Sequence, residues 1–136
     1  MRLTHDQIAA RVDKDADFAD WYVEDVMRNH FPQDYWDLSE EGKREMVLNG
    51  RAQARQFGFT RNQSQARFVT LMLLIAPNFH VQPGYRDALA DPALSEDARL
   101  DLCFDMDKDR AVDAIRQADA LYWFPDMLRR REDRRA

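Results

Sequence analysis

Apolar residues recur every three or four positions through the first quarter of the chain, which is the spacing of one face of an α-helix. This stripe consists of Phe18, Ala19, Tyr22, Val23, Val26, Met27 and His30. The sequence "THDQ" at residues 4–7 is a capping box, and Pro32 follows the stripe. We therefore expect a helix from about Thr4 to about His30, with Asp13 as the point where it could bend.

Two further helices are predicted in the middle of the chain. Ser39 is placed to cap the first of them and Gly58 to stop it. Its pattern should bury Met46, Gly50, Ala54 and Phe57 and expose Arg44, Arg51 and Arg55. A second capping box, "TRNQ" at residues 60–63, opens the next helix, "QARFVTLMLLIAP", which is apolar nearly all round. We expect this segment, with Leu73 near its middle and Pro77 at its end, to be the central helix of the core.

The last third of the chain continues the helical pattern. Residues 78–94 read as a connection with one short helix near Tyr85–Ala90, and Ser95 caps a long helix with a break near Asp107. Pro125 either opens a last short helix or interrupts the preceding one. No segment alternates with period two. The sequence therefore predicts an all-α fold, a single-domain bundle of about five helices over residues 1–128, followed by a basic, frayed tail over residues 129–136.

Charge is segregated along the chain. Residues 1–41 carry eleven acidic and four basic residues, residues 42–82 carry one and six, residues 83–128 carry eleven and five, and residues 129–136 carry two and five. The basic middle should therefore pack between the acidic ends. A nucleic-acid interface would need an uncompensated basic face, so we expect no nucleic acid among the partners.

The aspartates of "VDKDADFADWYVED" raise the question of calcium. Asp13, Asp15, Asp17 and Glu24 have the spacing of an EF-hand loop, but Phe18 stands where the loop needs glycine. The same acids fit the solvent face of a helix better. "DMDKDR" at residues 105–110 fails for the same reason, with Arg110 at the glycine position. We expect no metal site.

Other motifs of catalysis are absent from the sequence. The three histidines lie far apart, the glycines are isolated, and no serine sits in a nucleophile elbow. The single cysteine, Cys103, lies among apolar residues and reads as a buried structural thiol. We expect no catalytic residue, no cofactor and no enzymatic activity. The N-terminal residues show no secretory signal, and the longest apolar run is too short to span a bilayer, so we expect a cytoplasmic protein without membrane contact.

Two aromatic clusters are the better candidates for function. Tyr35 and Trp36 stand among acids in a predicted linker, and Tyr122, Trp123 and Phe124 are consecutive. Three adjacent residues of a helix cannot all face one core, so some of these rings should be exposed and could anchor a partner. The alternative is that they plug the ends of the bundle.

The segment from Phe31 to Phe79 resembles a family of small bacterial proteins. "HFP", "LSEEGKREMVLNGRAQARQFGFT" and "FVTLMLLIAPNF" carry the resemblance, together with "LTHDQIAA" near the start. Ala76 stands where the family usually has glycine, and its downstream P-W segment reads "PGYRDALADP" here. These proteins are encoded with type VI secretion spike and effector genes, mostly without assigned activity.

The resemblance implies a helical, non-enzymatic protein that binds a secreted effector or a spike component, as an accessory, adaptor or immunity partner. Acidic surface on the first and fourth helices would steer it toward a basic partner. The alternative is a small effector or enzyme with an activity of its own. The binding residues predicted from the sequence are Tyr35, Trp36, Asp17, Asp20, Glu24, Tyr122 and Trp123.

Overall fold

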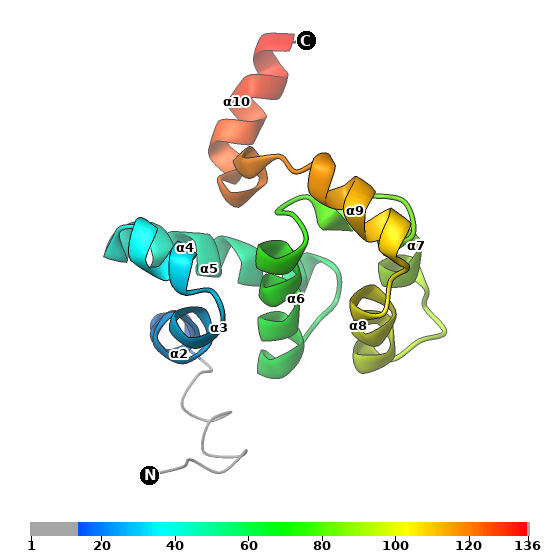
Figure 1. Cartoon of the computed structure of the whole chain (residues 1–136), viewed down its shortest axis with the longest axis horizontal. Helices are drawn as coiled ribbons and strands as arrows, with labels where there is room; N and C mark the ends of the chain where they lie inside the picture. Colours follow the sequence, from blue (N-terminus) through cyan, green and yellow to red (C-terminus); the bar gives the residue numbers. More distant parts are fainter. Residues whose placement is uncertain (1–13, 136) are drawn as a thin grey trace.

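Helices joined by short loops make up residues 14–135, which are the residues that the computed structural model describes, and no strand occurs among them. The two longest helices are α5 (Glu40–Gln56) and α6 (Asn62–Leu74). In Figure 1, α6 stands between the α2–α5 group on one side and α7 and α8 on the other. The prediction of an all-α fold is confirmed, and α6 is its central helix.

The N-terminal helix is continuous but changes its winding. It runs through α2 (Asp15–Trp21), a π-helical segment η1 (Tyr22–Met27) and α3 (Arg28–His30). Its predicted stripe is buried at Phe18, Ala19, Tyr22, Val23 and Met27. His30 is exposed instead, because it lies in the last turn beyond the packed region. The capping box at Thr4 and the bend at Asp13 lie outside the described residues.

Pro32 begins a helix that the sequence analysis assigned to a linker. The helix α4 covers Pro32–Asp37 and carries Tyr35 and Trp36. Proline suits the first position of a helix, because its φ is already helical and the N–H it lacks would have no helical partner. The linker prediction was therefore wrong, and the two aromatic residues have a fixed helical geometry.

The boundaries of α5 agree with its sequence signals. The Ser39 hydroxyl accepts a hydrogen bond from the Gly42 N–H, and Gly58 ends the segment at a φ of +84°, which favours glycine. Gly50 lies under α6, where a Cβ would come within 3.0 Å of Val69 Cγ2. The small residue thus allows the two central helices to approach closely.

Arg51 corrects the prediction that the arginines of α5 are exposed. Its side chain is 2% exposed and its guanidinium carbon lies 4.2 Å from the centroid of the Phe18 ring. The guanidinium donates to Gln65 Oε1 at 2.7 Å and to Asn62 Oδ1 at 2.7 Å, and it pairs with Asp15 at 2.9 Å. Since a buried charge is tolerated when it is paired and hydrogen-bonded, this arginine can join α2, α5 and α6.

The helix α6 differs from its prediction at both ends. Its N-cap residue is Arg61 and not the predicted Thr60, whose hydroxyl and N–H both donate to Glu96, at the start of α8. The helix ends at Leu74, before Pro77. Phe68, Val69, Leu71 and Met72 are buried, whereas Leu73 is only partly buried.

The C-terminal half follows the predicted order with more interruptions. After the short 3₁₀ turn η2 (Phe79–Val81) come α7 (Tyr85–Ala90), as expected, and α8 (Glu96–Phe104), capped by Ser95. Asp107 caps α9 (Lys108–Arg116), so the break near Asp107 is confirmed. A second break follows Arg116, before η3 (Ala120–Trp123). The bundle of about five helices was therefore too simple, because local caps divide the chain into shorter helices.

The last helix, α10 (Pro125–Arg135), begins at Pro125 and includes residues 129–135, which were expected to be a frayed tail. It points away from the other helices in Figure 1. Within the described residues, no helix is both long and apolar enough to cross a bilayer.

The expected complementarity between the basic middle and the acidic ends is confirmed. Toward the N-terminal side, Arg44 pairs with Asp20 at 2.8 Å and Arg55 with Asp15 at 3.5 Å. On the C-terminal side, Arg61 pairs with Asp97 at 2.7 Å and Arg67 with Asp101 at 2.6 Å. The two central helices therefore carry ion pairs on both flanks.

The central position of α6 predicts a strong effect of truncation at Leu71, which is fully buried. Leu71→Ala should lower the free energy of unfolding by about 2–5 kcal/mol, because it leaves a cavity in the core. Leu74→Ala, three residues further along the same helix but 51% exposed, should change it by less than about 0.5 kcal/mol. Urea denaturation of both variants measures the difference, and equal effects would contradict the packing of α6.

The buried guanidinium of Arg51 predicts a second stability effect. Arg51→Met keeps much of the apolar volume but leaves Gln65 Oε1 buried without this donor, which should cost about 1–3 kcal/mol. The control is Arg55→Met, at an arginine that also pairs with Asp15 but is about half exposed, and it should change stability by less than about 0.5 kcal/mol. Denaturation curves in low salt compare the two variants with the wild type.

Candidate functional site

Trp36 is the most exposed large apolar residue among those the structure describes, with 72% of its surface accessible. It lies on α4, next to Tyr35, and the two rings meet edge to face with their centroids 5.0 Å apart. Tyr35 itself is buried. The sequence placed these two residues together, and the structure assigns them opposite roles: one holds α4 to the core and the other faces solvent.

Tyr35 is fixed by two charged residues from neighbouring helices. Its hydroxyl donates to Glu24 Oε2 at 3.0 Å, and this hydrogen bond, followed by burial, raises the pKa of Tyr35. Lys43 Nζ lies 3.7 Å from the ring centroid, donates to the Tyr35 carbonyl at 3.0 Å and pairs with Glu40 at 2.8 Å. Lys43 is only 2% exposed, so α4 is held by a desolvated cation–π contact.

The acids predicted to bind a partner divide into paired and unpaired ones. Asp20 pairs with Arg44 at 2.8 Å, and Glu24 lies 4.0 Å from Arg44 and from Arg28. Only Asp17 is exposed without an ion pair among the described residues. Two of the three acids thus contribute to internal pairing, and the acids that flank Trp36 are those of α4 itself, Asp34 and Asp37.

Glu24 lies in the π-helical segment η1. The wider winding of a π-turn changes the direction of side chains relative to an α-helix, and such turns recur at functional sites. Here it allows the Glu24 carboxylate to meet Tyr35 and the arginines of two helices. The segment therefore helps to position α4 and, with it, Trp36.

The second aromatic cluster is mainly structural. Trp123 is 6% exposed and lies over Gly50, where a Cβ would be 3.6 Å from Trp123 Cζ3. Asn49 Nδ2 donates to the Trp123 carbonyl at 2.7 Å and Gln53 Nε2 to the Tyr122 carbonyl at 2.9 Å. Trp123 therefore packs into the core against α5 and is not an exposed anchor, and Tyr122 is half-buried beside it.

His80 and Cys103 are the buried titratable groups that could carry chemistry. The His80 ring lies 5.5 Å from Phe57, 5.9 Å from Phe68 and 5.7 Å from Tyr122, and burial lowers its pKa from 6.5 to about 4. Burial raises the pKa of the Cys103 thiol to about 12, which suppresses the nucleophilic thiolate. The interpretation of Cys103 as a buried thiol is confirmed.

Three of the four acids considered as calcium ligands, Asp15, Asp17 and Glu24, lie within the N-terminal helix and not in a loop. Asp15 and Asp17 belong to α2, and Asp15 is paired with Arg51; Asp13 lies outside the described residues. Within residues 14–135, no three His, Cys, Asp or Glu side chains are grouped to hold a metal ion.

The role of Lys43 in positioning α4 was not predicted from the sequence. The signal available was the spacing of Glu40, Lys43 and Arg44, since residues three and four apart share a helix face. That pattern predicts a surface pair, however, and it does not show that α4 folds over Lys43. The burial of the cation follows from tertiary packing alone.

The depressed pKa of His80 predicts a pH dependence of stability. Below pH 6.5 the unfolded chain binds a proton that the folded chain does not bind until about pH 4. The free energy of unfolding should therefore fall as the pH is lowered through this window, by about 3 kcal/mol in total.

His80→Phe removes this titration and should remove that component of the pH profile measured by urea denaturation. His30→Phe, at an exposed histidine, should retain the wild-type loss. A His80→Phe profile parallel to the wild type between pH 4 and 6.5 would contradict the buried, neutral histidine.

Comparison with known proteins does not identify a function for the surface around Trp36, so its interpretation rests on the geometry described above. The resemblance of residues 31–79 to proteins of type VI secretion loci stays a prediction. The chain matches no protein-family model, no curated protein and no solved structure.

Proposed function

We propose that the protein is a non-enzymatic protein-binding module whose contact is anchored by Trp36. The observation that carries the proposal is the combination of an exposed indole with a fixed support: Trp36 is 72% exposed, whereas its neighbour Tyr35 is 8% exposed. A side chain of this size gains free energy when a partner covers it, and tryptophan is enriched among residues that dominate binding.

The support matters because binding is weakened by the ordering of flexible groups. α4 is a helix of six residues, too short to be stable alone. Lys43 and Glu24 hold its only buried aromatic residue from two sides, so the backbone that carries Trp36 is ordered before a partner arrives. Preorganisation of this kind lowers the entropic cost of association.

The surroundings of Trp36 indicate the chemistry of the partner. Asp34 and Asp37 flank the aromatic pair on α4, and burial, followed by the charge of Asp37, raises the pKa of Asp34. A partner that covers Trp36 meets this negative rim. An apolar pocket surrounded by basic residues fits both features, since charges at the rim of an interface mainly steer association and exclude wrong partners.

Two buried groups support a role without catalysis. The thiol of Cys103 is protonated at neutral pH because its pKa is about 12, and the imidazole of His80 is enclosed by aromatic rings. The Cys103 side chain and His80 Nδ1 are both buried, whereas a nucleophile or a general base must reach its substrate.

The biological role within this class rests on the resemblance to proteins of type VI secretion loci. The protein would act in the bacterial cytoplasm as an accessory, adaptor or immunity partner of a secreted effector or spike component. An immunity partner would neutralise a toxic neighbour, whereas an adaptor would carry it to the secretion machinery. Both roles use the same kind of surface, a preformed anchor on a stable helical domain.

Replacing Trp36 should weaken binding without unfolding the protein. Trp36→Ala should reduce affinity by about 2 kcal/mol or more and change the free energy of unfolding by less than about 0.5 kcal/mol. Trp123→Ala, at the buried tryptophan, should instead cost about 3–5 kcal/mol in stability. Partners captured from the native host by the wild type are purified, and calorimetric titration compares the variants.

The matched control for exposed apolar area is Ile115→Ala, at an isoleucine that is 49% exposed on α9, away from α4 in Figure 1. This variant should bind as the wild type does. If Trp36→Ala binds the partner with full affinity, or if this variant is much less stable than the wild type, Trp36 is not a binding anchor. Toxicity of the protein when it is expressed alone in a susceptible host would favour an activity of its own.

A further inference from the structure

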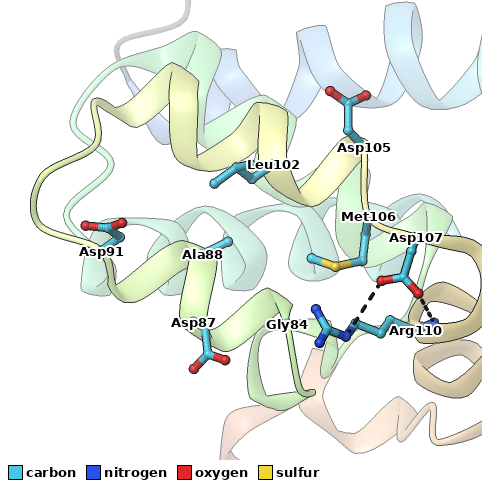
Figure 2. Close-up of a pocket in the computed structure, with 9 residues that line it drawn as sticks. All are labelled: Gly84, Asp87, Ala88, Asp91, Leu102, Asp105, Met106, Asp107 and Arg110. Carbon is cyan, nitrogen blue, oxygen red and sulfur yellow. Dashed lines mark hydrogen bonds and ion pairs between the residues drawn. The ribbon is translucent and has the colours of Figure 1, made fainter.

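A groove between α7 and α8 has an apolar floor and an acidic rim. Its volume is about 390 Å³, near the lower end for pockets that hold a ligand. Figure 2 shows Ala88, Leu102 and Met106 turned into the space between the two helices. Leu102 is 48% exposed, so this floor is open to solvent.

The closed end of the groove is built around Gly84. Its φ is +87°, and a Cβ there would lie 2.9 Å from Arg110 Cδ and 3.0 Å from Met106 Sδ. The positive φ favours glycine here, the side chains of Arg110 and Met106 lie close to this backbone, and Asp107 pairs with Arg110 at 3.6 Å. The floor is therefore shaped by the main chain and does not depend on a bound molecule.

The rim carries negative charges that are not all paired with basic side chains of the same chain. The lining holds four aspartates and one arginine. Asp87 and Asp105 have no ion pair among residues 14–135, whereas Asp97 and Asp101, also on α8, pair with Arg61 and Arg67. The occupant should thus be cationic at the rim and apolar at the floor.

The helix α10 offers this combination. Met127, Arg130 and Arg134 are three and four residues apart, so they lie along one helix face. Met127 is 48% exposed, and both arginines are exposed. The other cations of this helix are partly satisfied: Arg131 pairs with Asp119 at 2.7 Å and Arg129 with Asp126.

The helix also has little packing of its own. It meets the rest of the chain through η3, and its residues from 132 to 134 are exposed. A polar helix of 11 residues is marginally stable without tertiary contacts. In Figure 1 it runs away from α7 and α8, so it cannot reach the groove of its own chain while it stays on η3.

From these observations we infer that the groove between α7 and α8 binds α10 of a second copy of the chain. Met127 lies over the floor formed by Leu102 and Met106, and Arg130 and Arg134 meet Asp87 and Asp105. If two copies exchange their helices about a two-fold axis, the assembly closes as a dimer. This contact does not involve Trp36, so it is independent of the proposed function.

Self-association is measured by sedimentation velocity and light scattering over a range of protein concentrations. At low salt the protein should associate reversibly, and about 1 M salt should weaken association strongly, because it shortens the screening length to about 3 Å. A protein that stays monomeric at millimolar concentration in low salt would overturn the inference, even if the groove binds basic peptides of other origin.

Variants on both surfaces locate the contact. Asp87→Asn with Asp105→Asn, and separately Arg130→Gln with Arg134→Gln, should each raise the dissociation constant about tenfold. The control for the groove variant is Asp25→Asn with Asp113→Asn, which removes two negative charges outside the groove and should leave the dissociation constant unchanged. Melting curves show that each variant is folded. Association that survives both groove and helix variants, or that Trp36→Ala abolishes, would contradict the assigned surfaces.

A charge exchange gives the decisive result. Asp87→Lys with Asp105→Lys, or Arg130→Glu with Arg134→Glu, should each abolish association by placing like charges together. A chain that carries all four substitutions should associate again, since opposite charges then face each other. If the four-fold variant remains monomeric while folded, the two surfaces do not meet.

Discussion

The fold depends on a buried cation, Arg51, whose single side chain links α2, α5 and α6. Its guanidinium reaches Asp15 on α2 and Asn62 and Gln65 on α6, and it stacks over Phe18 at 4.2 Å. A buried charge is costly unless its donors are paired, so the geometry of all three helices is constrained together. Two helical turns earlier, Lys43 makes the same kind of contact with Tyr35 at 3.7 Å.

These two cations explain how α2 and α4 are held to α5 and why Trp36 is exposed. Lys43 and Arg51 both lie on α5, so one helix fixes α4 at one end and α2 at the other. Tyr35 is held beneath α4, and Trp36, about 100° further round the same helix, is directed to solvent. The exposure of Trp36 is thus a consequence of how α4 is attached and not a defect of the packing.

Helix caps and hydrophobic periodicity predicted much of the fold. The candidate site, in contrast, depends on tertiary contacts that such local sequence patterns do not reveal. Ser39, Ser95 and Gly58 act where the sequence placed them, because caps and positive φ depend on neighbouring residues. Burial of Arg51 was missed, since periodicity assigns arginine to the surface and cannot show that Gln65 and Asn62 will cover it. Trp36 and Trp123 look alike in sequence, and only the packing of the chain shows that Trp123 is buried beside Gly50 while Trp36 is exposed.

The charge segregation along the chain has a further consequence for its surfaces. The basic middle is matched on one flank by Asp15 and Asp20 and on the other by Asp97 and Asp101. Since these pairs neutralise the centre of the molecule, the remaining charge lies at its periphery. It is negative on α4 and around the groove of α7 and α8, and positive along α10. Surface charge that is not used within the fold is free to direct association, so this separation orients the molecule toward contacts with other chains.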